Sequence, residues 1–402
     1  MPSVHAELDP LDTNSLLTDA ERALRDRVAR IVDEEILPHA APAYEAGVLP
    51  REVVAAIGRA GAFGPWLTTH GGPGLGAVAC GLVLQELERA DSGFRSCASV
   101  QGSLVMWPIA TFGSEAQKDK WLPRLRTGEA LGCFALTEPT SGSDPASMKT
   151  RAVKDGDGYV LSGHKRWSTN GLSAEVAVVW AKVIEPGGPD PEGPEGSKLI
   201  RGFLVERGMP GFEPREIKHK MSLRASESSE LFFHEVRLPA SAMLPGAKGL
   251  GAPLKCLNEA RMGIAWGAVG AATACYASAR DYTKARVQFG RPLASFQLVQ
   301  AKLAQMYSDI GTAQLVCTQL GRLKEQGKLT PTQVSFAKRQ NVAMALDTAR
   351  VARDMLGANG ILLDHPPIRH AMNLETVKTY EGTHDVHTLV LGRAVTGMDA
   401  FS

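Results

Sequence analysis

The sequence has almost no net charge and no long hydrophobic run. Its 402 residues carry 44 Lys and Arg against 43 Asp and Glu, which gives a net charge of +1. No overall field would therefore attract nucleic acid or anionic lipid. No apolar run reaches the ~18 residues that a membrane span needs. We expect no nucleic-acid partner and no membrane span, so local cations or helix N-termini must hold any anionic ligand.

The sequence also lacks clustered cysteines and a basic leader. The six cysteines are dispersed without a CxxC pair, which argues against a disulfide framework or a zinc site. The first residues include Glu7, Asp9 and Asp12, and no Lys or Arg precedes Arg22. Such an acidic start is unlike a signal peptide or a mitochondrial presequence. We expect a reduced, cytoplasmic protein without a metal.

Hydrophobic periodicity divides the chain into regions 1–131, 132–246 and 247–402. The first predicts helices, at 51–60, 78–90 and 117–125 and after a capping box at Thr18–Glu21. The second has short β-type runs between turn residues, at 159–161, 176–183, 202–205 and 231–233. The third predicts long helices near 251–285, 296–325, 331–356 and 366–398, the last interrupted at Glu381–Thr383.

The order of these regions predicts the fold class. Asp155–Gly158 is a hairpin signal, and the Pro/Gly-rich stretch 185–198 (EPGGPDPEGPEGSK) is expected to be a mobile excursion between strands. Because strands do not alternate with helices, a doubly wound sheet is not expected. We predict an α+β protein with an N-terminal helical domain, a middle β-barrel-like domain and a C-terminal four-helix bundle.

Two motifs are better explained as ordinary structure. Gly72–Ala77 satisfies G-x-G-x-x-A, but a helical stretch precedes it and Pro73 lies inside it, whereas a dinucleotide fingerprint must follow a strand. His384 and His387 have a spacing that could share a metal. No further Cys/His cluster lies nearby, so helix-capping and hydrogen-bonding histidines are the preferred interpretation.

Four segments, in order, resemble the acyl-CoA dehydrogenases: Cys133–Asp144, Arg286–Pro292, Asp354–Gly360 and Thr379–His387. Taken alone, Glu381 would be a solvated or first-turn acid. The resemblance, which runs from about residue 15 to the C-terminus, implies instead that Glu381 removes the α-proton of an acyl-CoA thioester. It further implies an acyl-CoA dehydrogenase-like fold, FAD as cofactor, electron-transfer flavoprotein as acceptor and a homotetramer.

Four further segments resemble the glutaryl-CoA type within this family: Glu86–Ser96, Leu104–Pro108, Asn258–Trp266 and Ile368–Glu375. In this type a cation must meet the distal carboxylate of the substrate, and arginine suits that task. The resemblance places Arg95 there, with Glu88 around it, and implies further substrate contacts at Ser96, Ser99, Ser143, Leu254, Asn258, Arg261, Tyr380 and Gly382. The alternative is a structural Arg95–Glu88 ion pair.

The resemblance also implies the residues that contact FAD. Arg286 would supply charge for the pyrophosphate of a neighbouring subunit's flavin. The complete set is Phe134, Leu136, Thr137, Ser143, Trp167, Ser168, Thr169, Arg286, Phe289, Gln297, Thr383, Asp385 and Phe401. Taken singly, these residues would be a packed tryptophan, strand-end threonines and a surface arginine.

Three features depart from the glutaryl-CoA type. Ala135 replaces a usual glycine, Ser168 replaces a usual isoleucine, and the 185–198 loop is longer than expected. The predicted reaction is oxidative decarboxylation of glutaryl-CoA to crotonyl-CoA and CO2. The alternatives are a dehydrogenase of another short-chain acyl-CoA, a non-decarboxylating glutaryl-CoA dehydrogenase and a catalytically silent flavin- or acyl-CoA-binding scaffold.

Overall fold

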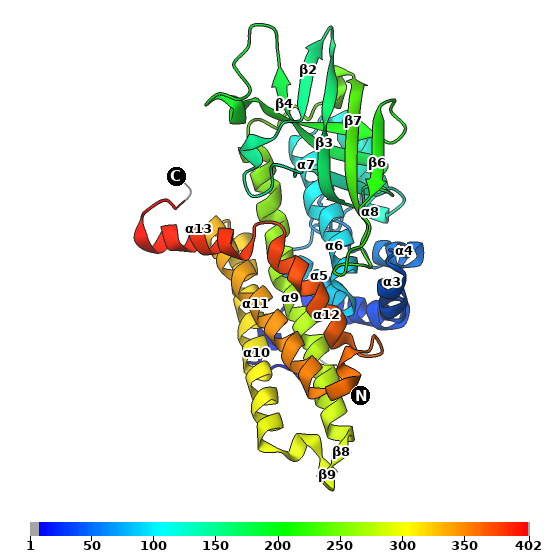
Figure 1. Cartoon of the computed structure of the whole chain (residues 1–402), viewed down its shortest axis with the longest axis vertical. Helices are drawn as coiled ribbons and strands as arrows, with labels where there is room; N and C mark the ends of the chain where they lie inside the picture. Colours follow the sequence, from blue (N-terminus) through cyan, green and yellow to red (C-terminus); the bar gives the residue numbers. More distant parts are fainter. Residues whose placement is uncertain (1–7, 401–402) are drawn as a thin grey trace.

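The chain folds into two helical parts with a curled sheet at one end of the long axis (Figure 1). The computed structural model describes residues 8–400. The longest helix (residues 251–285) extends from beside the sheet to the opposite end, and the last helix projects sideways from the body (Figure 1). Within the described residues, no helix is both long enough and apolar enough to cross a bilayer. The arrangement confirms the predicted α+β class.

The N-terminal part is helical, as predicted. Thr18 Oγ1 accepts a hydrogen bond from the Glu21 amide at 3.2 Å, and the Glu21 carboxylate accepts one from the Thr18 amide at 2.8 Å. This confirms the capping box. The main helices are α2 (Asp19–Ile31), α3 (Ala40–Ala46), α4 (Arg51–Arg59), α5 (Ala77–Ala90), α6 (Ser92–Ser99), α7 (Trp107–Phe112) and α8 (Glu115–Thr127), with a π-helical segment η4 (Val100–Met106) between α6 and α7.

The middle part is a seven-stranded sheet. Its strands are β1 (Gly132–Ala135), β2 (Arg151–Asp155), β3 (Gly158–Thr169), β4 (Val176–Ile184), β5 (Ile200–Glu206), β6 (Phe212–Glu216) and β7 (Ser228–Leu238). The order is β1-β4-β2-β3-β7-β6, with β5 also paired to β4. Strand β4 is parallel to β1 and β2 and antiparallel to β5. The Asp155–Gly158 hairpin prediction is confirmed by the β2–β3 register.

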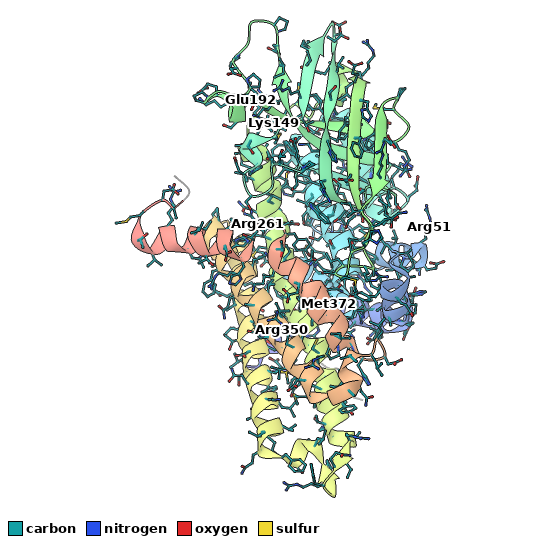
Figure 2. The ribbon with its side chains drawn as sticks, viewed as in Figure 1. Arg51, Lys149, Glu192, Arg261, Arg350 and Met372 are labelled. Carbon is teal, nitrogen blue, oxygen red and sulfur yellow. The ribbon has the colours of Figure 1, made fainter. Side chains whose placement is uncertain are left out.

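The stretch 185–198 leaves the sheet between β4 and β5, as predicted, but the sheet tethers it. Lys149 and Arg151 both form ion pairs with Glu192, and Figure 2 shows Lys149 and Glu192 close together at the sheet end. Lys182 Nζ donates to the Pro191 carbonyl at 2.7 Å. These contacts fix the middle of the excursion to β2 and β4.

The C-terminal part consists of α9 (Gly251–Ala285), α10 (Gln297–Glu325), α11 (Pro331–Met355), α12 (Pro366–Thr379) and α13 (His384–Thr396). Helix α9 packs against α5, α10, α11 and α12. Glycines allow the close approach to α5: a Cβ at Gly270 would lie 2.0 Å from the Gln85 carbonyl oxygen. The predicted interruption near Glu381 is confirmed, because α12 ends at Thr379 and α13 begins at His384.

The glycine motif Gly72–Ala77 forms an irregular loop that leads into α5. In the described part of the chain no strand comes before it. A dinucleotide fingerprint requires a strand at that place, so the loop interpretation is confirmed.

Candidate active site

The connection between α12 and α13 has an unusual backbone. Glu381 has a φ of 52° and Gly382 a φ of 90°. The left-handed region disfavours residues with a side chain, and such residues gather at functional sites. Thr383 then caps α13, because its Oγ1 accepts a hydrogen bond from the Val386 amide at 3.1 Å. We call residues 380–383 the base segment.

Side chains from two other helices hold the base segment. Arg261 of α9 donates from Nε to the Glu381 carbonyl at 2.8 Å and from Nη1 to Asn258 Oδ1 at 3.1 Å. Lys338 of α11 donates to the Gly382 carbonyl at 2.8 Å. Figure 2 shows Arg261 beside the junction of α12 and α13. The structure therefore brings the predicted residues Asn258, Arg261, Glu381 and Gly382 together.

The Glu381 side chain has the environment of a general base. The residue is partly exposed, but its Oε2 is buried and accepts no hydrogen bond from the described residues. Burial raises the pKa of Glu381 to about 7, against the opposing effect of the cations Arg261, Arg95 and Lys338. A carboxyl group with a pKa near the working pH is matched to proton transfer.

Arg95 on α6 is almost completely buried, at 1% exposed. Its Nε donates to Glu88 Oε2 at 2.5 Å, and its Nη2 donates to the Tyr380 hydroxyl. Burial alone would lower the pKa of Arg95, but the Glu88 carboxylate raises it, so the guanidinium stays charged. Gly267 of α9 makes room for this pair, since a Cβ there would lie 1.9 Å from Glu88 Oε2. The ion pair that we considered as an alternative therefore exists.

The ion pair does not use all the donors of Arg95. Nη1 of Arg95 donates to no group among the described residues. Ser96 and Ser99 of α6 are also buried, and neither Ser99 Oγ nor Glu88 Oε1 has a hydrogen-bond partner in residues 8–400. Because Tyr380 directly precedes Glu381, its contact with Arg95 places this polar cluster beside the base. Buried polar atoms without partners indicate a site for a ligand or for water.

Two cavities lie near these helices without containing the base. One of about 390 Å³ lies between α5, η4 and α9 and includes Ser99, Gly263 and Trp266 in its wall. The other, of about 690 Å³, lies between α10 and α11. Neither is lined by Glu381 or Arg95. Leu254, 37% exposed, lies one turn before Asn258 on α9 and faces the same side as the base segment.

The predicted flavin residues of the sheet lie at the ends of β1 and β3. Phe134 and Leu136 are buried, and Ser143 is exposed in the loop after β1. Trp167 is 54% exposed with a φ of 62°, and the guanidinium of Arg166 lies 5.3 Å from its ring centre. An exposed tryptophan held in a strained conformation fits a residue that stacks against a ligand.

Polar side chains next to Trp167 at the ends of β1 and β3 carry hydroxyl groups that can bind a ligand. Ser168 is buried and its Oγ has no partner among the described residues, although its carbonyl accepts a hydrogen bond from Ser229 at 3.0 Å. Thr137 and Thr169 are partly exposed. The Thr137 carbonyl is bonded to the Arg166 amide at 2.8 Å, so the ends of β1 and β3 are joined. Hydroxyls beside an exposed aromatic ring suit a flavin ring edge.

A second group of predicted flavin residues lies far from Glu381 in the same chain. Arg286, Phe289 and Gln297 are exposed around the β8–β9 hairpin (Val287–Gln288 and Arg291–Pro292), at the end opposite the sheet (Figure 1). The 25 helical residues from Arg261 to Arg286 correspond to roughly 38 Å. The side chain of Arg286 forms no hydrogen bond or ion pair within residues 8–400, although its backbone bonds Tyr282 and Leu293. Its charge is available to a molecule outside this protomer.

The remaining predicted residues lie on α13 or beyond it. Asp385 is exposed in the first turn of α13. His387 is buried, with Nδ1 3.0 Å from Ser335 Oγ, whereas His384 is partly exposed. In the described chain no three His, Cys, Asp or Glu side chains gather as metal ligands. Phe401 lies outside the described residues.

Sequence reasoning missed Lys338 and its helix face. Ser335, Lys338 and Asn341 follow each other at three-residue spacing on α11, and all three are buried. Polar residues are uncommon on a buried helix face unless they bind a partner. That periodic polar pattern was the signal in the sequence.

Comparisons with known proteins agree with this geometry. Family models match the acyl-CoA dehydrogenase N-terminal domain at residues 18–129, the middle domain at 133–236 and the C-terminal domain at 247–396. A solved glutaryl-CoA dehydrogenase from Mycobacterium smegmatis in complex with FADH2 is 47% identical, covers 99% of this chain and 100% of its own, and has a TM-score of 0.94. A second structure of glutaryl-CoA dehydrogenase from that organism is 51% identical over 97% of each chain, with a TM-score of 0.92. The mitochondrial isovaleryl-CoA dehydrogenase of Oryza sativa subsp. japonica is 32% identical over 94% of this chain and 91% of its own.

Proposed function

The chain belongs to the acyl-CoA dehydrogenase family as an FAD-dependent enzyme, and we propose that it converts glutaryl-CoA to crotonyl-CoA and CO2. The observation that carries this choice is the buried Arg95 beside the base segment. An unsubstituted acyl chain would need no cation at the end of its pocket. Glu88 occupies Nε alone and Tyr380 occupies Nη2, which leaves Nη1 for the carboxylate of a substrate.

The first step is removal of the α-proton by Glu381. Its carboxylate has no competing hydrogen bond at Oε2 within the described residues, and burial keeps it basic near neutral pH. FAD supplies the acceptor for the hydride that leaves the β-carbon. The backbone N–H of Glu381 donates to no described group. It is therefore free to polarise the thioester carbonyl and so acidify the α-proton.

The second step breaks the bond to the γ-carboxylate. Oxidation of glutaryl-CoA gives glutaconyl-CoA, in which the new double bond links the γ-carbon to the thioester. When CO2 leaves, the electron pair of the broken bond is delocalised into the thioester as a dienolate. Glu381 holds the proton removed in the first step and can return it, which gives crotonyl-CoA. Arg95 would hold the carboxylate until it leaves.

The residues at the ends of β1 and β3 fit FAD. Trp167 offers an exposed aromatic surface, and the unpaired Ser168 hydroxyl together with Thr137 and Thr169 offers polar groups beside it. Arg286 carries a charge without a partner among residues 8–400 and suits the pyrophosphate of FAD bound to a second protomer. We therefore place the cofactor at the sheet ends of one protomer with the β8–β9 hairpin of another over it.

This arrangement requires an oligomer and an external electron acceptor. Arg286 lies roughly 38 Å along α9 from Arg261, so a complete flavin site needs at least a dimer. Phe289, 94% exposed next to Arg286, would be covered by the same contact. We propose a homotetramer with electron-transfer flavoprotein as acceptor, as the family resemblance implies.

A second candidate is a dehydrogenase of another short or branched acyl-CoA. The Arg95–Glu88 ion pair favours it, because a carboxylate of the protein already neutralises the cation. The similarity to an isovaleryl-CoA dehydrogenase points the same way. In that case Arg95 would orient Tyr380 rather than bind the substrate.

Anaerobic mixing of the purified yellow protein with glutaryl-CoA tests the proposal. Flavin absorbance reports oxidation, and mass spectrometry of the thioester reports the product. We expect bleaching together with crotonyl-CoA. Bleaching that stops at glutaconyl-CoA would retain the dehydrogenase and exclude decarboxylation. Bleaching with butyryl-CoA or isovaleryl-CoA, but none with glutaryl-CoA, would favour the second candidate.

A further inference from the structure

Lys338 is a buried cation without a carboxylate partner. It lies on α11 and is 1% exposed. Its Nζ donates to the carbonyl oxygens of Gly382 at 2.8 Å, Tyr380 at 3.1 Å and Lys378 at 3.4 Å. A lysine ammonium has three N–H donors, so this one short segment of backbone uses all of them. No Asp or Glu oxygen of the described chain lies within ion-pair distance of Nζ.

The backbone that Lys338 binds is the strained part of the base segment. Glu381 and Gly382 both have positive φ values, a conformation that persists only when the surroundings fix it. Lys338 holds the carbonyls on either side of Glu381, and Arg261 holds the carbonyl of Glu381 itself at 2.8 Å. Three successive carbonyl groups are thus fixed from two helices, α11 and α9.

We propose that Lys338 is a positioning residue, which holds the Glu381 carboxylate and the Glu381 backbone N–H in the geometry needed for α-proton removal. This inference rests on the proposed role of Glu381 as the base. Lys338 acts through the backbone and does not need to touch the substrate. His387 supports the same segment from α13: it bonds Ser335 one turn before Lys338, and its ring lies against Gly382.

The charge of Lys338 also acts on the base. The charged or titratable groups around the base segment are Glu88, Arg95, Arg261, Lys338, Tyr380, Glu381, His384 and His387. Burial lowers the pKa of Lys338 to about 7, and the Glu381 carboxylate opposes that effect. Lys338 in turn lowers the pKa of Glu381 against the effect of burial. Each group favours the charged form of the other.

The variant Lys338→Met removes the ammonium and keeps an unbranched side chain. Its matched control is Ala345→Gly, a fully buried position two turns along the same helix, which weakens α11 without touching the base segment. Lys338→Arg keeps a cation with several N–H donors. It can be measured even if Lys338→Met does not fold. All are compared as FAD-loaded protein, with whichever acyl-CoA reduces the wild-type flavin.

Three readouts separate positioning from general loss of stability. For Lys338→Met we expect flavin reduction at saturating substrate to fall by about 10²-fold, the scale of a misplaced catalytic group, with KM changed much less. We expect the acidic limb of the pH profile of flavin reduction to move to higher pH, because loss of the nearby cation raises the pKa of Glu381. Amide exchange in residues 376–388 should accelerate. Lys338→Arg should restore part of each loss, and Ala345→Gly should show none of them.

Two results would overturn the inference. One is an unchanged pH profile and unchanged exchange in Lys338→Met. The other is a loss of rate that Ala345→Gly reproduces at equal thermal stability. If the wild-type flavin is reduced by no acyl-CoA, the proposed function fails instead. The amide-exchange comparison then still decides whether Lys338 holds the base segment.

Discussion

Nε of Arg261 donates a hydrogen bond to the carbonyl oxygen of Glu381 across 2.8 Å, between residues 120 positions apart in sequence. This contact joins the longest helix of the fold to the proposed base. It explains why the base segment can keep two successive left-handed residues, since their peptide groups are fixed from outside. The proposed removal of the α-proton by Glu381 would depend on that rigidity, because proton transfer requires aligned donor and acceptor atoms.

The pH dependence of flavin reduction should report Glu381. Burial raises its pKa to about 7, and only the deprotonated form can accept a proton. We expect kcat/KM to rise tenfold per pH unit below about 7 and to level off above it. Glu381→Gln should lower the rate by about 10²–10⁴-fold and abolish this limb. Anaerobic stopped-flow measurements from pH 5.5 to 9 check both; an unaltered limb in Glu381→Gln would assign it to another group.

Thermal stability should also report the titration of Glu381, but it should fall with rising pH where the rate of flavin reduction rises. The folded pKa of Glu381 lies above its ordinary value of 4.5. The stability that comes from its neutral form is therefore fully present below about 4.5 and is lost as pH rises through about 7. The side chain in Glu381→Gln is uncharged at every pH. The Tm of the variant should therefore rise relative to that of the wild type between pH 5 and pH 8. A Tm difference that does not change with pH would contradict the assignment.

Arg95 should determine whether a carboxylated acyl chain is accepted. Arg95→Met alone would leave Glu88 buried and unpaired, at a cost of about 3–5 kcal/mol in folding free energy. The double variant Arg95→Met/Glu88→Gln removes both charges and is the better test. We expect its kcat/KM with glutaryl-CoA to fall by roughly 30-fold or more, which corresponds to the ~2 kcal/mol lost when a buried charge pair is truncated. Butyryl-CoA serves as the internal control, and an equal loss with both substrates would give Arg95 a structural role.

Gly382 should tolerate no side chain. A Cβ there would lie 2.7 Å from His387 Nε2 and 3.3 Å from Arg261 Nη2, at a φ of 90°. We expect Gly382→Ala to destabilise the fold by about 1–3 kcal/mol and to lower flavin reduction at least about tenfold. Gly392 of α13 is the matched control, since a Cβ there meets nothing within 4 Å. Gly392→Ala should be neutral or stabilise by up to ~1 kcal/mol, and similar losses in both variants would contradict the expectation.

Arg286 should hold FAD in an assembled protein without affecting the fold. Arg286→Gln removes an exposed charge, so Tm of the flavin-free protein should not change. We expect the Kd of FAD to rise about tenfold or more, because a hydrogen bond to a charged group contributes about 1.5–3 kcal/mol. Arg51→Gln is the control: Arg51 is exposed on α4, on the opposite side from α13 (Figure 2), and has no ion pair in residues 8–400. Equal FAD affinity in both variants would exclude Arg286 from the cofactor site.

Local patterns predicted most of the secondary structure. The long helices of the C-terminal part begin and end within two residues of their predicted limits, because caps and helix-breaking residues act on neighbouring positions. The strands β1 and β6 were not predicted, whereas the hairpin signal at Asp155–Gly158 marked the turn that joins β2 to β3. β1 has only four residues, and β6 contains Pro214 and charged residues because it pairs only with β7, at the sheet edge where proline is tolerated. The division into regions at 131 and 246 stays a prediction.

The sequence by itself determined the order of the chain, with a helical region, a strand-rich region and a second helical region. Its motifs named Glu381 and Arg95 as candidate site residues. Only the tertiary structure decided how these residues meet. Arg95 reaches Tyr380 across 285 positions, and Lys338 reaches Gly382 from another helix. Such contacts depend on helix packing, here on glycines that let α5 and α9 approach, and no local pattern encodes which buried polar groups then become partners. The left-handed backbone at Glu381 has the same origin, because packing holds a conformation that the residue alone disfavours.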